Sequence, residues 1–269
     1  MDRVDQELAE VGALLVDERT LRRVIKRHLH LTGLGLQVPH AHGYALPRAE
    51  LATLLEDADL AEVLARLPAE VVVVTGDRDD LGAGDADAWS QAWRGVFHGR
   101  VHHAFAARLA DGLDVAAIRQ RIHRLGQTEF DEVRFVLRQE DLLLPPADDV
   151  TTYVEFVAHY LELAAFAPEL LAQTFPMLRG QPRVDATIAL DVDAAALLAA
   201  ARPGAGAGVA AARPGARRRR RDPGDPAAAG GPGRPHAGAA RRGRGPPARQ
   251  QRARRDPGVA RRRSDHRAR

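Results

Sequence analysis

Apolar residues recur every three or four positions along most of the first 200 residues, which is the spacing of amphipathic helices. Gly, Pro and capping residues separate these segments from one another. In the first segment, Val4, Leu8 and Val11 follow the helical spacing, and Leu14 and Leu15 extend it. The pattern predicts about eight helices, over residues 2–16, 20–30, 48 onward, 88–110, 114–125, 128–141, 149–165 and 168–174, with a last helix over 185–201.

Capping residues mark several of the predicted helix ends. Asp114 precedes the helix over 114–125, and Gly126 ends that helix as the residue after its C-cap. Thr128 and Asp131 resemble a capping box, in which Thr is the N-cap and an acidic side chain lies three residues later. The box predicts that the next helix starts at Thr128.

One segment has the pattern of a strand. Val71–Val74 are four β-branched residues in a row between Pro68 and Gly76, and such a run suits a buried strand over residues 69–75. Because a single strand cannot pair its own backbone groups, we expect a partner strand, for which Leu34–Val38 is the candidate. The expected fold is therefore mainly α: a multi-helix, bundle-like domain with a minor β element near residues 69–75.

Composition and charge change abruptly near residue 202. Residues 201–269 contain 20 Arg and 4 acidic residues, a net charge of +16, whereas residues 1–200 contain 19 basic and 32 acidic residues, a net charge of −13. From Arg202 on, the chain has no Leu, Ile, Met, Glu or aromatic residue, so it cannot bury enough apolar surface to offset its ordering entropy. We expect a helical globular domain over 1–201 and a disordered Arg/Pro/Gly/Ala tail over 202–269.

Three interpretations compete for this tail. Its basic runs, such as Arg217–Arg221, suit a nucleic-acid-binding arm, although no aromatic residue is interleaved to stack on bases. Alternatively, the tail is a disordered segment without a function, or it is the product of GC-rich DNA translated out of frame. The abrupt loss of Leu, Glu and aromatic residues within a helical pattern favours out-of-frame translation, and we expect a nucleic-acid partner only if the tail is genuine.

Several classes of protein are excluded or disfavoured. The chain has no Cys, which excludes disulfides, thiolate metal sites and Cys nucleophiles. Met1–Glu7 is acidic and lacks the apolar segment of a signal peptide, and no segment approaches the ~20 apolar residues of a membrane span. We therefore expect a cytoplasmic protein without a membrane segment. Ser90, the single Ser before residue 264, lies in a predicted helix without flanking glycines, which argues against a serine hydrolase.

Four residues on two predicted helices suggest a metal site. His98 and His102 are four residues apart, as are Glu155 and His159, so each pair lies on one side of its helix. If the two helices pack antiparallel, they offer three imidazoles and a carboxylate, a ligand set that suits zinc or iron. His123 or Glu129 then serves as a supporting group or as a base.

The same residues have an ordinary structural interpretation. His98 and His102 lie well away from the main apolar stripe of their helix, and Glu155 and His159 lie opposite the apolar stripe of theirs. Both pairs therefore also suit solvated or hydrogen-bonded helix faces, and Glu155–His159 suits an exposed helical ion pair. The strongest helical zinc motif, His-Glu-x-x-His, is absent from the chain.

Three other polar clusters have weaker functional interpretations. His40 and His42 resemble the first ligand pair of barrel metallohydrolases, but that barrel needs eight strands and the sequence predicts one or two. The acidic run Asp77–Asp80 suits either a divalent cation or, as we prefer, a solvated turn. His28 ends a predicted helix, where a cationic side chain favours the helix dipole.

The sequence leaves the function open between two classes. The acidic body, residues 1–200, and the lack of a complete set of catalytic residues favour a helical protein-interaction module with a protein partner. The alternative is a metal-dependent enzyme that uses zinc or iron at a helical His/Glu site made of His98, His102, Glu155 and His159. The sequence does not decide whether the chain is an enzyme.

Overall fold

The computed structural model describes residues 2–31, 43–55, 61–143, 146–178 and 180–204, which all belong to one unit, Met1–Arg217. These residues form twelve helices and a three-stranded sheet, which confirms the prediction of a mainly α fold with a minor β element. None of the described helices is long and apolar enough to cross a membrane. The tail from residue 205, the His40–His42 pair and Leu34–Val38 lie outside the described residues.

The sheet is built around the predicted valine strand. This strand, β3 (Glu70–Thr75), lies between β1 (Ala13–Val16), which runs parallel to it, and β2 (Gly43–Pro47), which runs antiparallel. Val73 of β3 pairs with Leu14 on one side and with Tyr44 on the other. All four valines are buried because both faces of the sheet are covered by helices.

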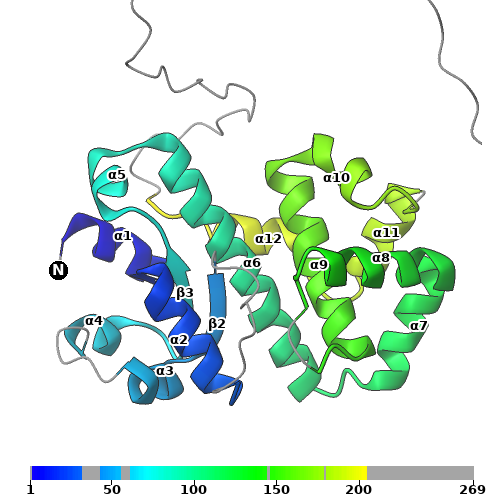
Figure 1. The fold of residues 1–269 in the computed structure, drawn as a ribbon, viewed down its shortest axis with the longest axis horizontal. Helices are drawn as coiled ribbons and strands as arrows, with labels where there is room; N and C mark the ends of the chain where they lie inside the picture. Colours follow the sequence, from blue (N-terminus) through cyan, green and yellow to red (C-terminus); the bar gives the residue numbers. More distant parts are fainter. Residues whose placement is uncertain (1, 32–42, 56–60, 144–145, 179, 205–269) are drawn as a thin grey trace, which may run out of the picture. The chain divides into compact units, whose positions relative to one another are not determined.

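Alternate side chains of β3 enter two hydrophobic cores. Val71 and Val73 pack with the buried residues of α2 (Glu18–His28), α3 (Arg48–Leu55) and α4 (Ala61–Arg66). Val72 and Val74 point to the opposite face, as alternation along a strand requires. That face is covered by α1 (Arg3–Glu10), α5 (Arg78–Ala83) and the long helix α6 (Ala86–Ala110), as Figure 1 shows.

Two glycines of α6 allow the helix to lie directly on the sheet. A Cβ atom at Gly99 would overlap the side chain of Val72, and a Cβ atom at Gly43 of β2 would lie 2.5 Å from the carbonyl oxygen of Gly95. Gly95 and Gly99 are one turn apart, so the two close contacts fix one face of α6 against β2 and β3. The rotation of α6 about its axis is thereby set, and with it the direction of His98 and His102.

The second half of the described residues is an array of helices around α9 (Asp149–Phe166). α9 contacts α6, α7 (Val115–Leu125), α8 (Gln127–Gln139) and α10 (Pro168–Thr174), and α11 (Gln181–Ile188) and α12 (Ala194–Ala200) complete the array. Every residue from Thr152 to Leu163 is buried. A helix buried on all sides places its polar face inside the protein as well as its apolar face.

Two predicted helix boundaries are wrong. The helix predicted over 2–16 ends at Glu10, because Gly12 adopts a positive φ of 69° and the next four residues form the buried strand β1. The helix predicted from Thr128 starts instead at Gln127, behind Gly126, and no side chain caps it.

The helix predicted over 185–201 is two helices. Asp193 leaves the helical conformation and caps α12 by accepting a hydrogen bond from the backbone N–H of Ala196. Asp191 turns inward and pairs with Arg121 of α7. The two carboxylates therefore interrupt the helix that the apolar spacing predicted.

Candidate metal centre

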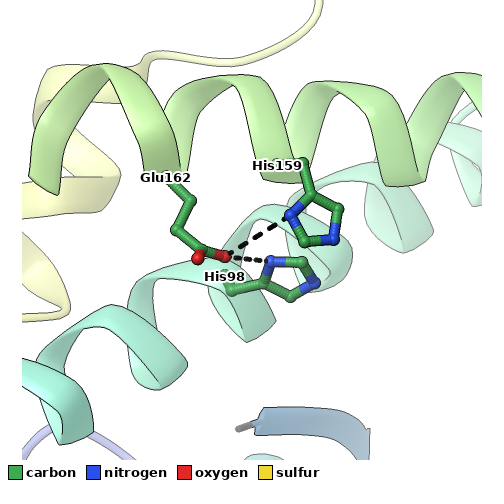
Figure 2. Close-up of side chains that lie close together, drawn as sticks. All are labelled: His98, His159 and Glu162. Atoms are coloured by element: carbon green, nitrogen blue, oxygen red, sulfur yellow. Dashed lines mark hydrogen bonds and ion pairs between the residues drawn. The ribbon is translucent and has the colours of Figure 1, made fainter. Parts of the chain in front are cut away.

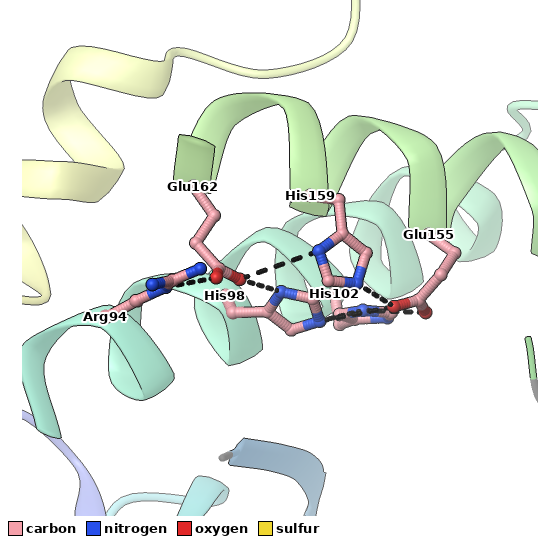
Figure 3. Close-up of polar contacts among 6 residues, drawn as sticks. All are labelled: Arg94, His98, His102, Glu155, His159 and Glu162. Atoms are coloured by element: carbon pink, nitrogen blue, oxygen red, sulfur yellow. Dashed lines mark hydrogen bonds and ion pairs between the residues drawn. The ribbon is translucent and has the colours of Figure 1, made fainter. Parts of the chain in front are cut away.

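His98 and His102 of α6 face Glu155, His159 and Glu162 of α9 (Figure 3). The spacings of four residues on α6 and of three, four and seven residues on α9 put each set on one helix face. The ring contacts Trp93–Phe166 and Phe105–Tyr153 show that the start of α6 meets the end of α9, so the two helices run antiparallel and the two polar faces meet.

The carboxylate of Glu155 lies close to three imidazoles. The Nε2 atoms of His98 and His102 are 3.1 Å apart. The Glu155 carboxylate lies 3.5 Å from Nε2 of His98, 3.4 Å from Nε2 of His102 and 3.3 Å from Nε2 of His159. Two trios have ligand atoms within 4.8 Å of one another: His98, His102 and Glu155, and His98, His159 and Glu162.

These separations suit ligands that share a metal ion. Imidazole nitrogens and carboxylate oxygens bind zinc at about 2.0–2.2 Å, so neighbouring ligands of a tetrahedral site lie roughly 3.3–3.5 Å apart. A charge-assisted hydrogen bond between imidazole and carboxylate is shorter, at about 2.7–2.9 Å. The three distances from Glu155 to the imidazoles match the first geometry.

Glu162 has a different place in the cluster, because its carboxylate lies on the Nδ1 side of the rings of His98 and His159 (Figure 2). One of its oxygens lies 2.8 Å from Nδ1 of His98 and 3.9 Å from Nδ1 of His159, on the side of each ring away from Nε2. The guanidinium of Arg94 holds the other oxygen. A carboxylate that accepts the Nδ1–H of a histidine orients the ring and leaves Nε2 free of a proton for a metal.

The charges in the cluster favour a cation at its centre. Glu155 and Glu162 are 8% and 6% exposed, and Arg94 supplies one positive charge against these two buried carboxylates. An uncompensated buried charge is costly, so a proton or a metal ion is expected to complete the balance. Burial lowers the pKa of His98, but the carboxylates of Glu155 and Glu162 outweigh burial and raise that pKa to about 10, so without a metal ion a proton on His98 completes the balance.

Burial and the neighbouring charges also shift the pKa values of His102, Glu155 and Glu162. Burial and the neighbouring histidines lower the pKa of His102 to about 4, so its ring is neutral near pH 7 and can bind a metal. Burial acts to raise the pKa of Glu155, but the histidines around it hold that pKa well below its usual value. For Glu162, the same opposition between burial and His98 leaves a pKa of about 2. Both carboxylates are therefore charged near neutral pH.

One side of the cluster opens into a cavity. His98, His102 and Glu155 all line a space of about 690 Å³ that extends along α6 and α9 and reaches β2. His103, next to His102, lines the same cavity but turns to Glu70 of β3, with 3.4 Å between Nε2 and the carboxylate. A ligand in the cavity thus has access to the point between the imidazoles.

The structure brings together all four residues predicted as metal ligands. The competing expectation of a solvated face is wrong for His98, Glu155 and His159, which are 5%, 8% and 8% exposed. The competing expectation of hydrogen-bonded histidines agrees with the contact between His98 and Glu162. The polar face of α9 is buried because the helix lies in the centre of the array. That these residues bind a metal stays a prediction.

Other sequence-predicted residues lie elsewhere. His123 is exposed on α7, and Glu129 of α8 pairs with Arg183 of α11, so neither supports the cluster. Glu162 holds the supporting position that was proposed for them. Asp77 caps α5, and Asp79 and Asp80 lie in the first turn of that helix, so the acidic run is exposed as expected but begins a helix instead of forming a turn. His28 contacts Tyr44 and Glu50 in addition to ending α2.

We found no family model, curated protein or solved structure that matches this chain.

Proposed function

We propose that this protein is a metal-dependent enzyme that holds zinc or iron with His98, His102, Glu155 and His159. The observation that carries the proposal is that the Glu155 carboxylate lies 3.3–3.5 Å from the Nε2 atoms of three imidazoles, which suits ligands around one ion. The carboxylate of Glu162 behind His98 supports the same assignment, because metal-binding histidines almost always have such a partner.

The donor set limits the chemistry. Three imidazoles and one carboxylate suit zinc or iron better than calcium or magnesium, which prefer oxygen ligands. Four protein ligands would fill a tetrahedral zinc site, so the ion would need a fifth coordination position to polarise a substrate oxygen or to lower the pKa of a bound water. Because His98, His102 and Glu155 line the cavity, a further ligand would reach the ion from that side.

Metal analysis of the untagged full-length protein tests this proposal. We expect about one zinc or iron per chain, and a rise in Tm when zinc is added to protein treated with a chelator. At a free metal concentration of 100 times Kd, the gain in unfolding free energy is about 2.7 kcal/mol.

Matched variants assign the metal to the cluster. We expect Glu155→Gln and His102→Ala to retain less than a tenth of the metal. His103→Ala is the control, because His103 is the adjacent residue on α6, lines the same cavity and pairs with Glu70 instead. Wild-type protein without metal and without a zinc-dependent gain in Tm would contradict the proposal. Equal metal content in wild-type and Glu155→Gln protein would contradict it as well.

The other predictions from the sequence remain proposals. They are a protein partner for the acidic body, a cytoplasmic location, and a nucleic-acid partner only if the basic tail is genuine. The enzyme proposal takes precedence over the protein-interaction module because the His/Glu cluster is a specific arrangement, whereas an acidic composition is compatible with many functions.

A further inference from the structure

The cavity beside the cluster has the size of a small-molecule site. Its volume of about 690 Å³ lies within the range of roughly 300–1,000 Å³ that is usual for such sites. Most of the described residues that line it are apolar, and the polar ones include three of the four proposed metal ligands. A molecule in this cavity would therefore meet the metal with one end and apolar side chains along the rest of its length.

The apolar wall continues directly from the proposed ligands. Ala106 lies one turn beyond His102 on α6, and Leu109 follows on the same side. On α9, which runs antiparallel, Val154 and Val150 precede Glu155 and line the same space. The two helices thus form an apolar wall that starts at the cluster and extends toward the end of α6 and the start of α9.

Part of this wall is exposed, although it consists of apolar side chains. Leu109 is 37% exposed, and Ala106 is exposed as well. Exposed apolar surface that continues from a polar cluster is typical of a ligand site. An extended apolar molecule would cover this surface and would gain free energy from each group that it buries.

We infer that the substrate is a small molecule with an extended apolar body and one oxygen-donor group that binds the metal. The oxygen-donor group lies at His98, His102 and Glu155, and the apolar body lies along Ala106, Leu109 and Val150. This inference rests on the proposed metal-dependent function, because the metal holds one end of the molecule.

A series of alkyl hydroxamates of increasing length tests the inference. The probes are the hydroxamates of acetic, butanoic, hexanoic and octanoic acid, which present the same oxygen pair to the metal. Their affinities are measured by calorimetry on the zinc-loaded, untagged full-length protein, after the zinc content has been determined. We expect each buried methylene to raise the affinity by up to roughly fourfold, and the octanoic probe to bind at least about 100-fold more tightly than the acetic probe.

A pair of tryptophan variants locates the apolar body. Ala106→Trp narrows the cavity and should weaken the octanoic probe by roughly tenfold or more, while the affinity of the acetic probe stays unchanged. Ala116→Trp is the matched control, because Ala116 is an exposed alanine of α7 outside the cavity lining. Ala116→Trp should leave both affinities unchanged. Both positions are exposed, so neither variant is expected to disturb folding.

The outcomes separate this inference from the function on which it rests. Stoichiometric zinc together with affinity that grows with chain length and falls in Ala106→Trp supports the inference. Stoichiometric zinc with equal affinity for all four probes overturns the inference and leaves the metal-dependent function standing. Protein that binds no zinc overturns both.

Discussion

Glu155 and Glu162 are two carboxylates buried between α6 and α9, and they have different partners at the scale of single residues. Glu155 faces the Nε2 atoms of three histidines at 3.3–3.5 Å, where the metal would lie. Glu162 accepts from Nδ1 of His98 and is held by Arg94. The first carboxylate would bind the ion, and the second would orient a ligand and tune its basicity.

This difference predicts a graded effect of substitution at Glu162. Glu162→Gln keeps the shape of the side chain but removes its charge, and it should weaken zinc binding by roughly 10–100-fold without abolishing it. Zinc affinity, measured by competition with a chelator, should be unchanged in Glu169→Gln, which alters an exposed glutamate of α10. Equal zinc affinity in Glu162→Gln and wild type would show that Glu162 has no part in the site.

The sequence predicted the four proposed ligands but missed Glu162. His98, His102, Glu155 and His159 stand out as two pairs at a spacing of four residues. Glu162 is three residues beyond His159 and seven beyond Glu155, so the helical spacing itself was a sufficient signal. The burial of His98, Glu155, His159 and Glu162 was not predictable, because the sequence does not state which helix lies at the centre of the array.

At the scale of secondary-structure elements, α6 connects the sheet to the His/Glu cluster. Gly95 and Gly99 bring one face of the helix into contact with β2 and β3, and His98 and His102 lie on the face toward α9. The sheet therefore acts as a rigid support for the two histidines of α6. Rigid elements hold ligands more accurately than loops do.

The close contact at Gly99 predicts a loss of stability on substitution. Gly99→Ala would insert a methyl group into the space of Val72, and overpacking of this kind costs about 1–3 kcal/mol of unfolding free energy. Gly82→Ala is the matched control, because apart from the neighbouring backbone of α5 no atom lies within 4 Å of the added methyl group. The control should be neutral or slightly stabilising, since Ala favours helix. Equal Tm values for the two variants would contradict the packing described for α6.

The sequence predicted most helices and the strand β3, but it did not predict the strand β1, which directly follows α1. The valine run predicted β3 correctly, and the helices over 114–125 and 168–174 have nearly the predicted bounds. Leu14 and Leu15 suited a helix by spacing, but they form β1 because β3 offers a parallel partner 59 residues away. A partner so distant along the chain is a tertiary effect that local spacing does not contain.

At the scale of the whole molecule, much of the acidic charge of the body has a structural task. Seven of the described helices have an Asp N-cap whose side chain accepts a backbone N–H: Asp2, Asp17, Asp77, Asp85, Asp114, Asp148 and Asp193. Such caps stabilise a helix by roughly 0.5–2 kcal/mol each. A net charge of −13 over residues 1–200 is thus weaker support for an acidic binding surface than composition suggested.

The burial of the tyrosines predicts a pH response of the whole fold. Burial raises the pKa values of Tyr44, Tyr153 and Tyr160, the three tyrosines of the chain, and the nearby carboxylates add to the effect. Because the folded pKa values exceed the unfolded value of about 10, the neutral hydroxyls contribute stability that is present below pH 10 and is lost as the pH rises further.

Absorbance at 295 nm, which reports phenolate, checks this prediction. In urea-unfolded protein the tyrosines should titrate with a midpoint near pH 10, whereas native protein should show no phenolate until it unfolds at higher pH. Coincident titration curves for native and unfolded protein would contradict the burial of these side chains.

The central claim is that three histidines and one glutamate from α6 and α9 bind a single ion. X-ray absorption at the zinc edge of the zinc-loaded full-length protein tests it most directly. The account predicts nitrogen and oxygen ligands at about 2.0–2.2 Å, with outer-shell scattering from three imidazoles that is reduced in His102→Ala and unchanged in His103→Ala. A spectrum without imidazole scattering, or one that is the same in His102→Ala, would contradict the account.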